Sequence, residues 1–255
     1  MVEEIKTAAR FDNRVANYAA YRPGYPRAFV EFMRDELGLT AASVVADVGS
    51  GTGILAGMLL GEGCRVFAVE PNAAMRAAAE ATLGTDPNFV SVAGTAEATT
   101  LGDTSVDFAT AAQAFHWFDA ERARAEFRRI LKPRGWAVVV WNNRRTASTA
   151  FLRDYERLLR RFGTDYAQVA ATYGDGRSLR KFFASGHRVK RFDNFQLFDF
   201  DGLKGRLLSA SYVPLAGHPS HEPMLAELRR VFDAHEQGGR VRVEYDTDVY
   251  YGQLV

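Results

Sequence analysis

The stretch VVADVGSGTGILAGMLL, residues 44–60, decides the fold of this chain. In it, an apolar run ends at three alternating glycines, Gly49, Gly51 and Gly53, and an apolar helical pattern follows. Glycine permits the backbone angles of a tight turn and lets a ligand approach the chain closely. A helix that begins directly behind such a turn offers unpaired N–H groups at its first turn. The stretch therefore predicts a β-strand, a ligand-binding turn and an α-helix.

The alternation of strands and helices continues after this stretch. Short apolar runs predict strands, and amphipathic runs predict helices. Because the strands are almost wholly apolar, we expect helices to cover both faces of the sheet. The pattern predicts an α/β fold with a mostly parallel sheet. The expected strands are 43–48, 65–70, 88–93, 106–111 and 136–141, and the expected helices are 52–60, 73–83 and 120–131.

The flanking segments follow other patterns. Before this region, a helix is expected to end at the break Pro23-Gly24-Tyr25-Pro26, and a second helix is expected to end at Gly38. We expect one domain over residues 1–255, in which 1–40 form a helical lid, 41–142 the ligand-binding core, and 143–255 a substrate cap with the last strands. The later elements expected are helices at 151–162, 179–184, 202–211 and 223–235, a strand at 189–200 that is continuous or divided at Asp193-Asn194, and a last strand at 240–251.

Composition limits the class of protein. The 255 residues are 47% hydrophobic and 25% charged, which is typical of a globular domain and excludes a disordered tail, a collagen-like rod and a disulfide-stapled mini-domain. No run approaches the roughly 18 consecutive apolar residues that span a bilayer, and residues 1–10 lack the apolar segment of a signal peptide. Because Cys64 is the single cysteine and cannot form an internal disulfide, we expect a cytoplasmic protein. Because no run is long enough to span a bilayer, we expect no membrane partner.

Charge is distributed unevenly, although the net charge is +1. Counting lysine and arginine against aspartate and glutamate gives −7 for residues 1–120, +12 for 121–191 and −4 for 192–255. The basic middle segment either attracts an anionic partner or consists of solvated helix faces. Both interpretations remain open from the sequence.

A carboxylate lies at the end of the second expected strand. Glu70 follows Gly49 by 21 residues, the distance at which a strand-end acid binds the hydroxyls of a ribose. Nicotinamide dinucleotide sites, however, have the spacing G-x-G-x-x-G. Here the third glycine comes one residue early, and Ile54 stands in its place. This departure argues against a nicotinamide-dependent oxidoreductase.

The acid and glycines from Asp47 to Gly53 resemble the first motif of the class I S-adenosylmethionine (SAM)-dependent methyltransferases of the type 11 group. The segment 94–97 is similar to the adenine-binding loop of that family, with Thr95 where members often have Asp, and 131–135 to its turn before strand five. The resemblance implies a Rossmann-like fold, a seven-stranded, mostly parallel sheet with an antiparallel last strand, and SAM as cofactor with S-adenosylhomocysteine as product. The residues that would bind SAM are Asp47, Gly49, Ser50, Gly51, Gly53, Glu70, Pro71, Asn72, Met75, Thr95, Ala96, Glu97, Gln113 and Tyr18.

Segments outside the core are similar to a subgroup related to the trans-aconitate methyltransferases. These segments are 21–26, 112–118, 209–214 and 245–252, so the similarity covers nearly the whole chain. It implies methyl transfer to a small-molecule acceptor, for which a carboxylate is one candidate. The residues expected to contact the substrate, from their places on the lid, at the ends of strands or in the cap, are Arg22, Tyr25, Trp117, Trp141, Asn142, Arg144 and Tyr212.

Methyl transfer from a sulfonium is an in-line displacement, and positioning with exclusion of water supplies much of the catalysis. A carboxylate acceptor needs no base at pH 7, whereas a hydroxyl, an ammonium or an acidic carbon does. His116, just past the fourth strand, is the candidate base, or else it only hydrogen-bonds cofactor, backbone or substrate. We expect no metal site, because His218 and His221 have no third ligand at motif spacing.

Two other functions are compatible with parts of the pattern. A nucleic-acid methyltransferase would account for the basic segment, but residues 113–116 lack the Asn/Asp-Pro-Pro-aromatic motif of many such enzymes. We therefore expect no nucleic-acid partner. A non-catalytic SAM-binding protein would bind the cofactor without turnover. The sequence leaves open the acceptor atom and whether the protein is a monomer or a homodimer.

Overall fold

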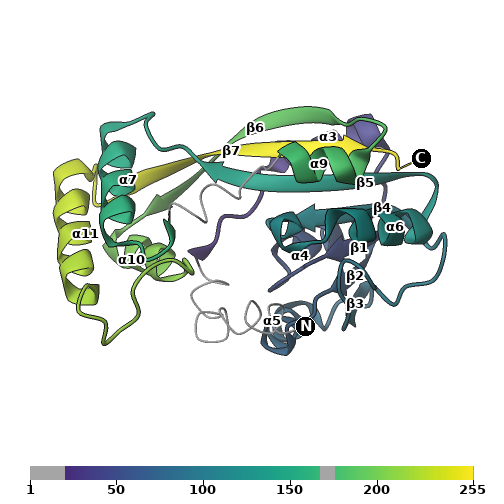
Figure 1. Ribbon diagram of the computed structural model, residues 1–255, viewed down its shortest axis with the longest axis horizontal. Coiled ribbons are helices and arrows are strands. Elements are labelled where there is room, and N and C mark those ends of the chain that lie inside the picture. Colours follow the sequence, from purple (N-terminus) through teal and green to yellow (C-terminus); the bar gives the residue numbers. More distant parts are fainter. Residues whose placement is uncertain (1–20, 167–175, 255) are drawn as a thin grey trace. The chain divides into compact units, whose positions relative to one another are not determined.

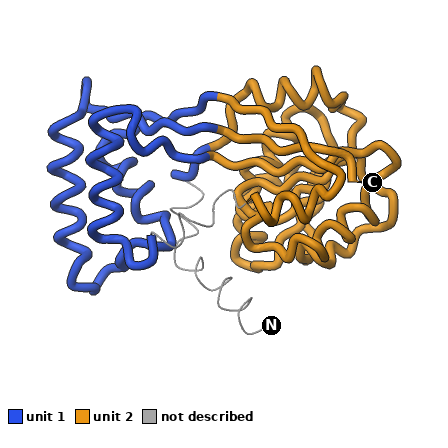
Figure 2. The backbone as a smooth tube through the Cα atoms, turned by 45° about the horizontal axis from the view of Figure 1, so that its top comes forward, with its two compact units in different colours: residues 1–23, 143–173, 193–246 blue, residues 24–142, 174–192, 247–255 orange. Residues whose placement is uncertain are grey.

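The computed structural model describes residues 21–166 and 176–254, and the chain divides into two compact units (Figure 2). Unit 1 comprises residues 1–23, 143–173 and 193–246, and unit 2 comprises residues 24–142, 174–192 and 247–255. The helix expected before Pro23 lies outside the described residues. The single-domain organisation expected from the sequence stays a prediction.

The strands form one seven-stranded sheet in the order β3-β2-β1-β4-β5-β7-β6 (Figure 1). The pairs β3-β2, β2-β1, β1-β4 and β4-β5 are parallel, and the last strands are antiparallel. The predicted Rossmann-like α/β class is thereby confirmed. The strands are β1 (Val44–Val48), β2 (Arg65–Val69), β3 (Phe89–Val92), β4 (Val106–Ala112), β5 (Leu131–Arg144), β6 (Arg188–Phe198) and β7 (Val241–Gly252).

The helices begin and end where the sequence provides capping residues. Gly38 ends the first described helix in a left-handed conformation, with φ of 79°. The side chains of Asn72 and Asp119 accept backbone N–H groups at the starts of two others. The helices are α3 (Arg27–Leu37), α4 (Ile54–Leu60), α5 (Ala73–Leu83), the 3₁₀ turn η1 (Phe115–Trp117), α6 (Ala120–Ile130), α7 (Ala150–Phe162), α9 (Gly176–Phe183), α10 (Phe200–Leu208) and α11 (His221–His235).

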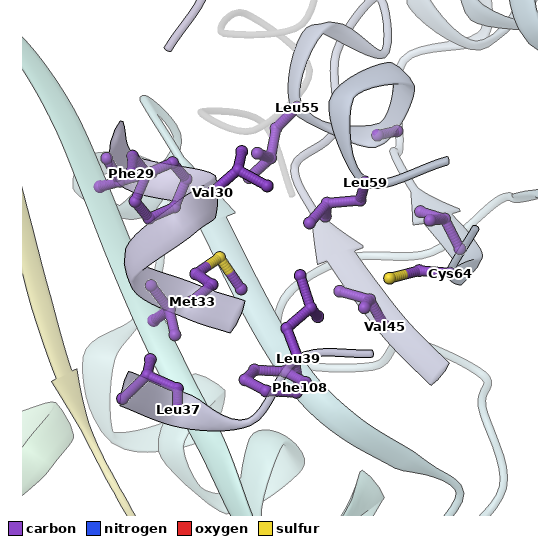
Figure 3. Close-up of a cluster of buried hydrophobic side chains, with 14 of the residues drawn as sticks. Phe29, Val30, Met33, Leu37, Leu39, Val45, Leu55, Leu59, Cys64 and Phe108 are labelled. Atoms are coloured by element: carbon purple, nitrogen blue, oxygen red, sulfur yellow. The ribbon is translucent and has the colours of Figure 1, made fainter. Parts of the chain in front are cut away.

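Helices cover both faces of the sheet in unit 2. Figure 3 shows Met33 of α3 and Leu59 of α4 in one buried cluster with strand residues such as Val45. Successive strand residues point to opposite faces, and the other face carries an aromatic cluster. There the ring of Phe115 lies 5.9 Å from Trp141 of β5 and 4.9 Å from Phe182 of α9, and Phe182 also packs against α6.

Two strands differ in detail from the expectations. β6 is continuous from Arg188 to Phe198, so no division occurs at 193–194. β5 begins at Leu131, five residues before the expected start, because Leu131 already pairs with Val106 of β4. A register irregularity between Val106 and Phe108 accommodates the intervening turn, in which Arg134 has a φ of 68°. β5 therefore begins directly after α6 ends at Ile130, and the turn lies within β5.

Unit 1 has a hydrophobic core of its own. α7, α10 and α11 pack around it with the first part of β7, and its members include Leu159, Leu207, Leu228 and Tyr245. The ring of Tyr21 also packs here, on the bare backbone of Gly205, where any Cβ would overlap it. The residues directly before Pro23 are thus fixed to α10.

A buried carboxylate fixes the loop after β3 to α6. Glu126, 8% exposed, accepts the backbone N–H of Thr99 at 2.8 Å and binds Arg129 through both oxygens. The Arg129 guanidinium holds the pKa of Glu126 well below its usual 4.5, at about 2, and the Thr99 bonds add to this. The carboxylate therefore stabilises the fold above pH 4.5, and this contribution is lost as pH falls towards 2.

We expect Glu126→Gln to lower the free energy of unfolding at pH 7 by about 1–3 kcal/mol, because the donors on Thr99 and Arg129 lose a charged acceptor. Thermal unfolding measured from pH 7 to pH 2.5 checks this. The difference from the wild type should shrink below pH 4.5 and nearly vanish at the lowest pH. Glu121→Gln, an exposed acid on the same helix, is the matched control and should change little; a constant difference at all pH values would contradict the assignment.

Candidate active site

The turn after β1 is built from three glycines in left-handed conformations. The φ angles are 70° at Gly49, 57° at Gly51 and 84° at Gly53. These left-handed conformations are costly for any residue that has a side chain. A Cβ on Gly49 would lie 2.5 Å from the Cβ of Ala114, and one on Gly53 would lie 2.6 Å from Leu83. A Cβ on Gly51 would meet nothing within 4 Å. Packing thus requires the outer two glycines, while the middle one leaves its backbone open to a ligand.

Glu70 lies beside this turn, directly after β2. Its Oε2 accepts the N–H of Gly51 at 3.0 Å, and its Oε1 accepts the N–H of Asn72 at 2.9 Å. The residue is 9% exposed, and this burial raises the pKa of its carboxyl although the two N–H groups oppose the shift. Each carboxylate oxygen has a second lone pair. The group can therefore accept hydrogen bonds from a bound diol as well.

Asp47, in β1, is a second buried acid at the same end of the sheet. Its Oδ1 accepts the hydroxyl of Thr110 at 2.9 Å, and the residue is 1% exposed. Within the described residues its Oδ2 has no hydrogen-bond partner. Burial raises the pKa of Asp47 to about 7, the Thr110 hydroxyl and the backbone N–H of Ala56 oppose this shift, and the nearby charge of Glu70 adds to it. A buried acceptor without a donor is rare, so this oxygen is suited to a cationic or N–H-bearing ligand group.

Two hydroxyls of the turn are also buried without a hydrogen-bond partner within the described ranges. The Oγ of Ser50 and the Oγ1 of Thr52 are buried, and neither has a hydrogen-bond partner in the part of the chain that the structure describes. Hydroxyls can both donate and accept. The turn thus presents open backbone, two available hydroxyls and a buried carboxylate oxygen.

The residues after Glu70 start α5. Asn72 caps this helix, since its side chain accepts the N–H of Met75 at 2.9 Å. Met75 is buried, and Pro71 is exposed. Arg76 donates to the carbonyls of Glu70 and Pro71 at 2.8 and 2.9 Å. This network fixes the backbone on which a ribose would rest.

The loop after β3 contains the three residues predicted to face an adenine. Thr95 is exposed and exchanges backbone hydrogen bonds with Ala98. Ala96 is buried, and the carboxylate of Glu97 accepts the N–H of Asp119 at 2.9 Å. The loop is therefore fixed at Glu97 and, through Thr99, at α6.

Past the end of β4 the backbone is unusual. Gln113 has a φ of 57°, which is rare for a residue with a side chain, and its amide donates to the carbonyl of Asn142 at 3.1 Å. His116 follows on η1, half-buried, with its ring 4.6 Å from that of Trp117. Trp117 is 45% exposed. Strain of this kind is often found at functional sites.

Asn142 connects three segments of unit 2. Its amide donates to the carbonyl of Gly24 at 3.1 Å, and its Oδ1 accepts the hydroxyl of Thr247 at 2.6 Å. Next to it, Trp141 is 1% exposed and belongs to the aromatic cluster. Tyr25 packs on Phe29, with ring centroids 5.9 Å apart. Contacts of these residues with a substrate stay predictions.

Three residues predicted for the substrate lie in unit 1. Arg22 donates to the carbonyl of Ser209 at 3.2 Å. Arg144 forms an ion pair with Glu156 at 2.6 Å, and the ring of Tyr212 lies 5.0 Å from that of Tyr166. Their substrate contacts also stay predictions, and Tyr18 lies outside the described residues.

Sequence reasoning missed two polar residues of interest. Thr110 is the hydroxyl partner of Asp47, and its signal was a single polar residue within the otherwise apolar stretch 108–112. Arg206 is buried in unit 1, and its signal was a charge next to the apolar pair 207–208. Over residues 21–166 and 176–254, no group of three metal-ligating side chains meets. Over the same ranges, no helix has the length and apolarity to cross a bilayer.

Comparison with known proteins agrees with this geometry. Residues 46–139 match the family model of a methyltransferase domain. An uncharacterized methyltransferase of Mycobacterium tuberculosis is 40% identical over 134 residues, 52% of each chain. An uncharacterized methyltransferase-like protein of Schizosaccharomyces pombe is 32% identical over 166 residues, 65% of this chain and 63% of its own. The chain spans about half the length of the curated mycobacterial relatives it matches.

Solved structures resemble most of the chain. A proposed type II methyltransferase from Anaeromyxobacter dehalogenans is 26% identical, with a TM-score of 0.72 over 92% of this chain and 99% of that one. A phosphoethanolamine N-methyltransferase of Haemonchus contortus, solved with S-adenosylhomocysteine, shares the fold alone, with 12% identity, a TM-score of 0.56, and coverage of 94% of this chain and 56% of that one. Residues 46–139 thus match a methyltransferase domain, and the chain has the Rossmann-like methyltransferase fold.

Proposed function

We propose that the chain is a SAM-dependent methyltransferase that transfers a methyl group to a small-molecule acceptor. The observation that carries this proposal is the pair of buried carboxylates on neighbouring strands. Asp47 and Glu70 flank a glycine turn whose middle residue is open. An acid in the place of Glu70 also binds the ribose in dinucleotide sites, but the second acid, Asp47, would repel a pyrophosphate at the turn, whereas the ammonium of an amino acid needs such an acceptor.

The groups of SAM fit the residues present. The unpartnered Oδ2 of Asp47 suits the ammonium of the methionine part, and the hydroxyls of Ser50 and Thr52 suit its carboxylate. Glu70 has lone pairs for the ribose hydroxyls. The open backbone at Gly51 leaves room for the part of SAM that joins its methionine end to its ribose. When bound, SAM supplies a methyl group on a sulfonium, which is an excellent leaving group.

The chain's own contribution would be binding, orientation and exclusion of water. Gln113, Asn142 and Gly24 are joined by hydrogen bonds, which fix the backbone past β4 and β5. His116 is half-buried just beyond, so it is available as a proton acceptor for a hydroxyl or amine, or as a plain contact for a carboxylate acceptor.

The charge pattern disfavours a nucleic-acid substrate. Most cations of the basic segment 121–191 that appear in ion pairs do so within their own unit, as Arg129 does with Glu126 and Arg145 with Asp246. Further pairs join Lys181 to Glu121 and Arg191 to Asp248. Paired cations contribute less to a positive field than the count of +12 suggests. A small-molecule acceptor is therefore the better proposal.

We expect Glu70→Gln to weaken SAM binding about 10- to 100-fold, because charged hydrogen bonds to the ribose are lost. Isothermal titration calorimetry with SAM measures this. Glu80→Gln, an exposed acid on α5, is the control and should bind as the wild type does. Equal affinity of the Glu70 variant and the wild type would remove the cofactor assignment.

The affinity for SAM should depend on pH through Asp47. With its pKa near 7, the carboxylate is half protonated there, and only its charged form attracts an ammonium. Affinity should therefore rise from pH 5.5 to 7.5 in the wild type and stay flat and weak in Asp47→Asn. The raised pKa also means that ionised Asp47 destabilises the ligand-free fold as pH rises from about 4 to 7. The variant should then unfold at the same or a higher temperature at pH 7.5; a lower one would make Asp47 a structural residue.

The reaction itself is tested by release of S-adenosylhomocysteine with polycarboxylates, phenols, amines and bulk tRNA as acceptors. We expect turnover with a small molecule and none with tRNA. Turnover confined to carboxylates and kept in His116→Ala would make this histidine a contact. Turnover on phenols or amines that the same variant loses would make it the base. SAM binding without turnover on any acceptor would favour a non-catalytic protein.

A further inference from the structure

Strand β6 is an edge of the sheet, because the strand order ends with β5-β7-β6 (Figure 1). An edge strand pairs with a neighbour on one side only, and the N–H and C=O groups of its other side can pair with another chain. Proteins often keep such strands short. β6 is 11 residues long and continuous from Arg188 to Phe198, so it offers an extended template for pairing.

The outward face of β6 carries exposed apolar side chains. Val189 is 54% exposed, Phe195 47% and Leu197 51%. Even numbers of residues separate them, so they point to the same side of the strand. Phe192 points to the other side, where its ring lies 5.8 Å from that of Phe32. Three of the five large hydrophobic residues that are exposed within the described ranges thus lie on one face of one strand, and apolar residues gathered in this way mark an interaction surface.

The exposed ring of Phe195 is held by the neighbouring strand. The guanidinium carbon of Arg242, on β7, lies 3.7 Å from the centroid of this ring. The contact fixes the ring without covering it, since nearly half of the residue remains exposed. A side chain that is already fixed loses little conformational freedom on binding. Phe195 is therefore suited to anchor a partner.

The charges of β6 are separated by sign along the strand. Arg188, Lys190 and Arg191 lie in its first half, and Asp193 is the one charged residue of its second half. The side chain of Asp193 is 86% exposed, although Arg145 binds it. The side chain of Arg191 is 62% exposed, although a carboxylate of β7 binds it. Both charges can therefore meet a further, opposite charge at the surface.

Antiparallel pairing of β6 with the same strand of a second copy would match these features in one register. With Phe192 opposite Phe192 of the partner subunit, Val189 lies opposite Phe195 of the partner subunit. In the same register, Arg191 lies opposite Asp193 of the partner subunit. Each contact occurs twice, because a two-fold axis relates the copies. Apolar and oppositely charged side chains that face each other directly stabilise a strand pair.

The neighbouring registers lack this match. A shift by one residue would place the exposed face of one strand on the side of the buried face of the other. A shift by two residues in one direction would place Asp193 opposite Asp193 of the partner subunit. The same shift in the other direction would place Arg191 opposite Arg191 of the partner subunit. Like charges directly opposite each other are destabilising, so the charges of β6 favour a single register.

We propose that β6 is the interface for a second copy of this chain, which joins it by antiparallel pairing and extends the sheet across two subunits. The observation that carries the proposal is the register in which Val189 meets Phe195 and Arg191 meets Asp193. The proposal goes beyond methyl transfer and does not depend on it, since no cofactor or acceptor takes part. Because pairing of one edge strand buries less surface than a standard interface, we expect a dissociation constant of about 1–100 μM.

Sedimentation equilibrium of the full chain, at about 1–300 μM and without SAM, measures the dimer. We expect the wild type to dimerise and Asp193→Arg to weaken the dimer about 10-fold or more, because it places two cations opposite each other. Phe195→Lys should weaken it similarly, because the anchor is lost. Leu215→Lys, at an exposed apolar residue outside β6, is the matched control and should dimerise as the wild type does. A wild type that stays monomeric would overturn the proposal, as would variants of β6 that dimerise normally.

Disulfide cross-linking tests the register and uses substitutions of exposed residues that the fold tolerates. The native Cys64 is buried, so the introduced thiols give the signal. Val189→Cys combined with Phe195→Cys should form a covalent dimer on mild oxidation, because directly opposed Cβ atoms lie about 4.5–5.5 Å apart. Val189→Cys combined with Leu197→Cys is the matched control, since these residues would lie diagonally, about 7–8 Å apart, and it should cross-link far less. Equal or stronger cross-linking of the control pair would refute the proposed pairing.

Discussion

The carboxylate of Glu70 holds the candidate site together. By accepting the N–H groups of Gly51 and Asn72, it joins the turn after β1 to the start of α5. Strand pairing aligns β1 with β2, as Val48 with Val69, and the N–H groups of Gly49 and Ser50 donate to the carbonyl of Val69. The bonds of Glu70 extend this link to Gly51, in the middle of the turn. The same acid retains lone pairs for a ligand. One buried group thus fixes the backbone of the site and supplies part of its chemistry.

The glycine turn divides its residues between packing and binding. Gly49 and Gly53 are needed because Ala114 and Leu83 occupy the space of any side chain. Gly51 has open space and needs only its left-handed backbone. Next to it, Asp47 is kept near its point of ionisation by burial. Ionised Asp47 therefore destabilises the ligand-free fold, and the ammonium of the proposed ligand would offset this cost.

Elsewhere in the described residues, many basic side chains pair with nearby acids. Part of the basic middle of the sequence forms local ion pairs, such as Arg129 with Glu126 in unit 2 and Arg144 with Glu156 in unit 1. Arg206 stands apart because its nearest polar neighbours, Tyr245 and Ser209, are neutral. The net charge of long sequence segments does not show which individual cations are paired.

The sequence by itself determined the succession of strands and helices along the core, the glycine turn and the strand-end acid. These are local: four apolar residues and Asp47 make β1, Gly49 to Gly53 make the turn, and α5 has the expected bounds of 73–83. It could not decide whether β6 was divided, because pairing with β7 makes it continuous through Asp193. Nor could it find the partners of Asp47 and Arg206. Only the tertiary structure brings Thr110 to the first and withholds an acid from the second, since burial and pairing arise between residues far apart in the chain.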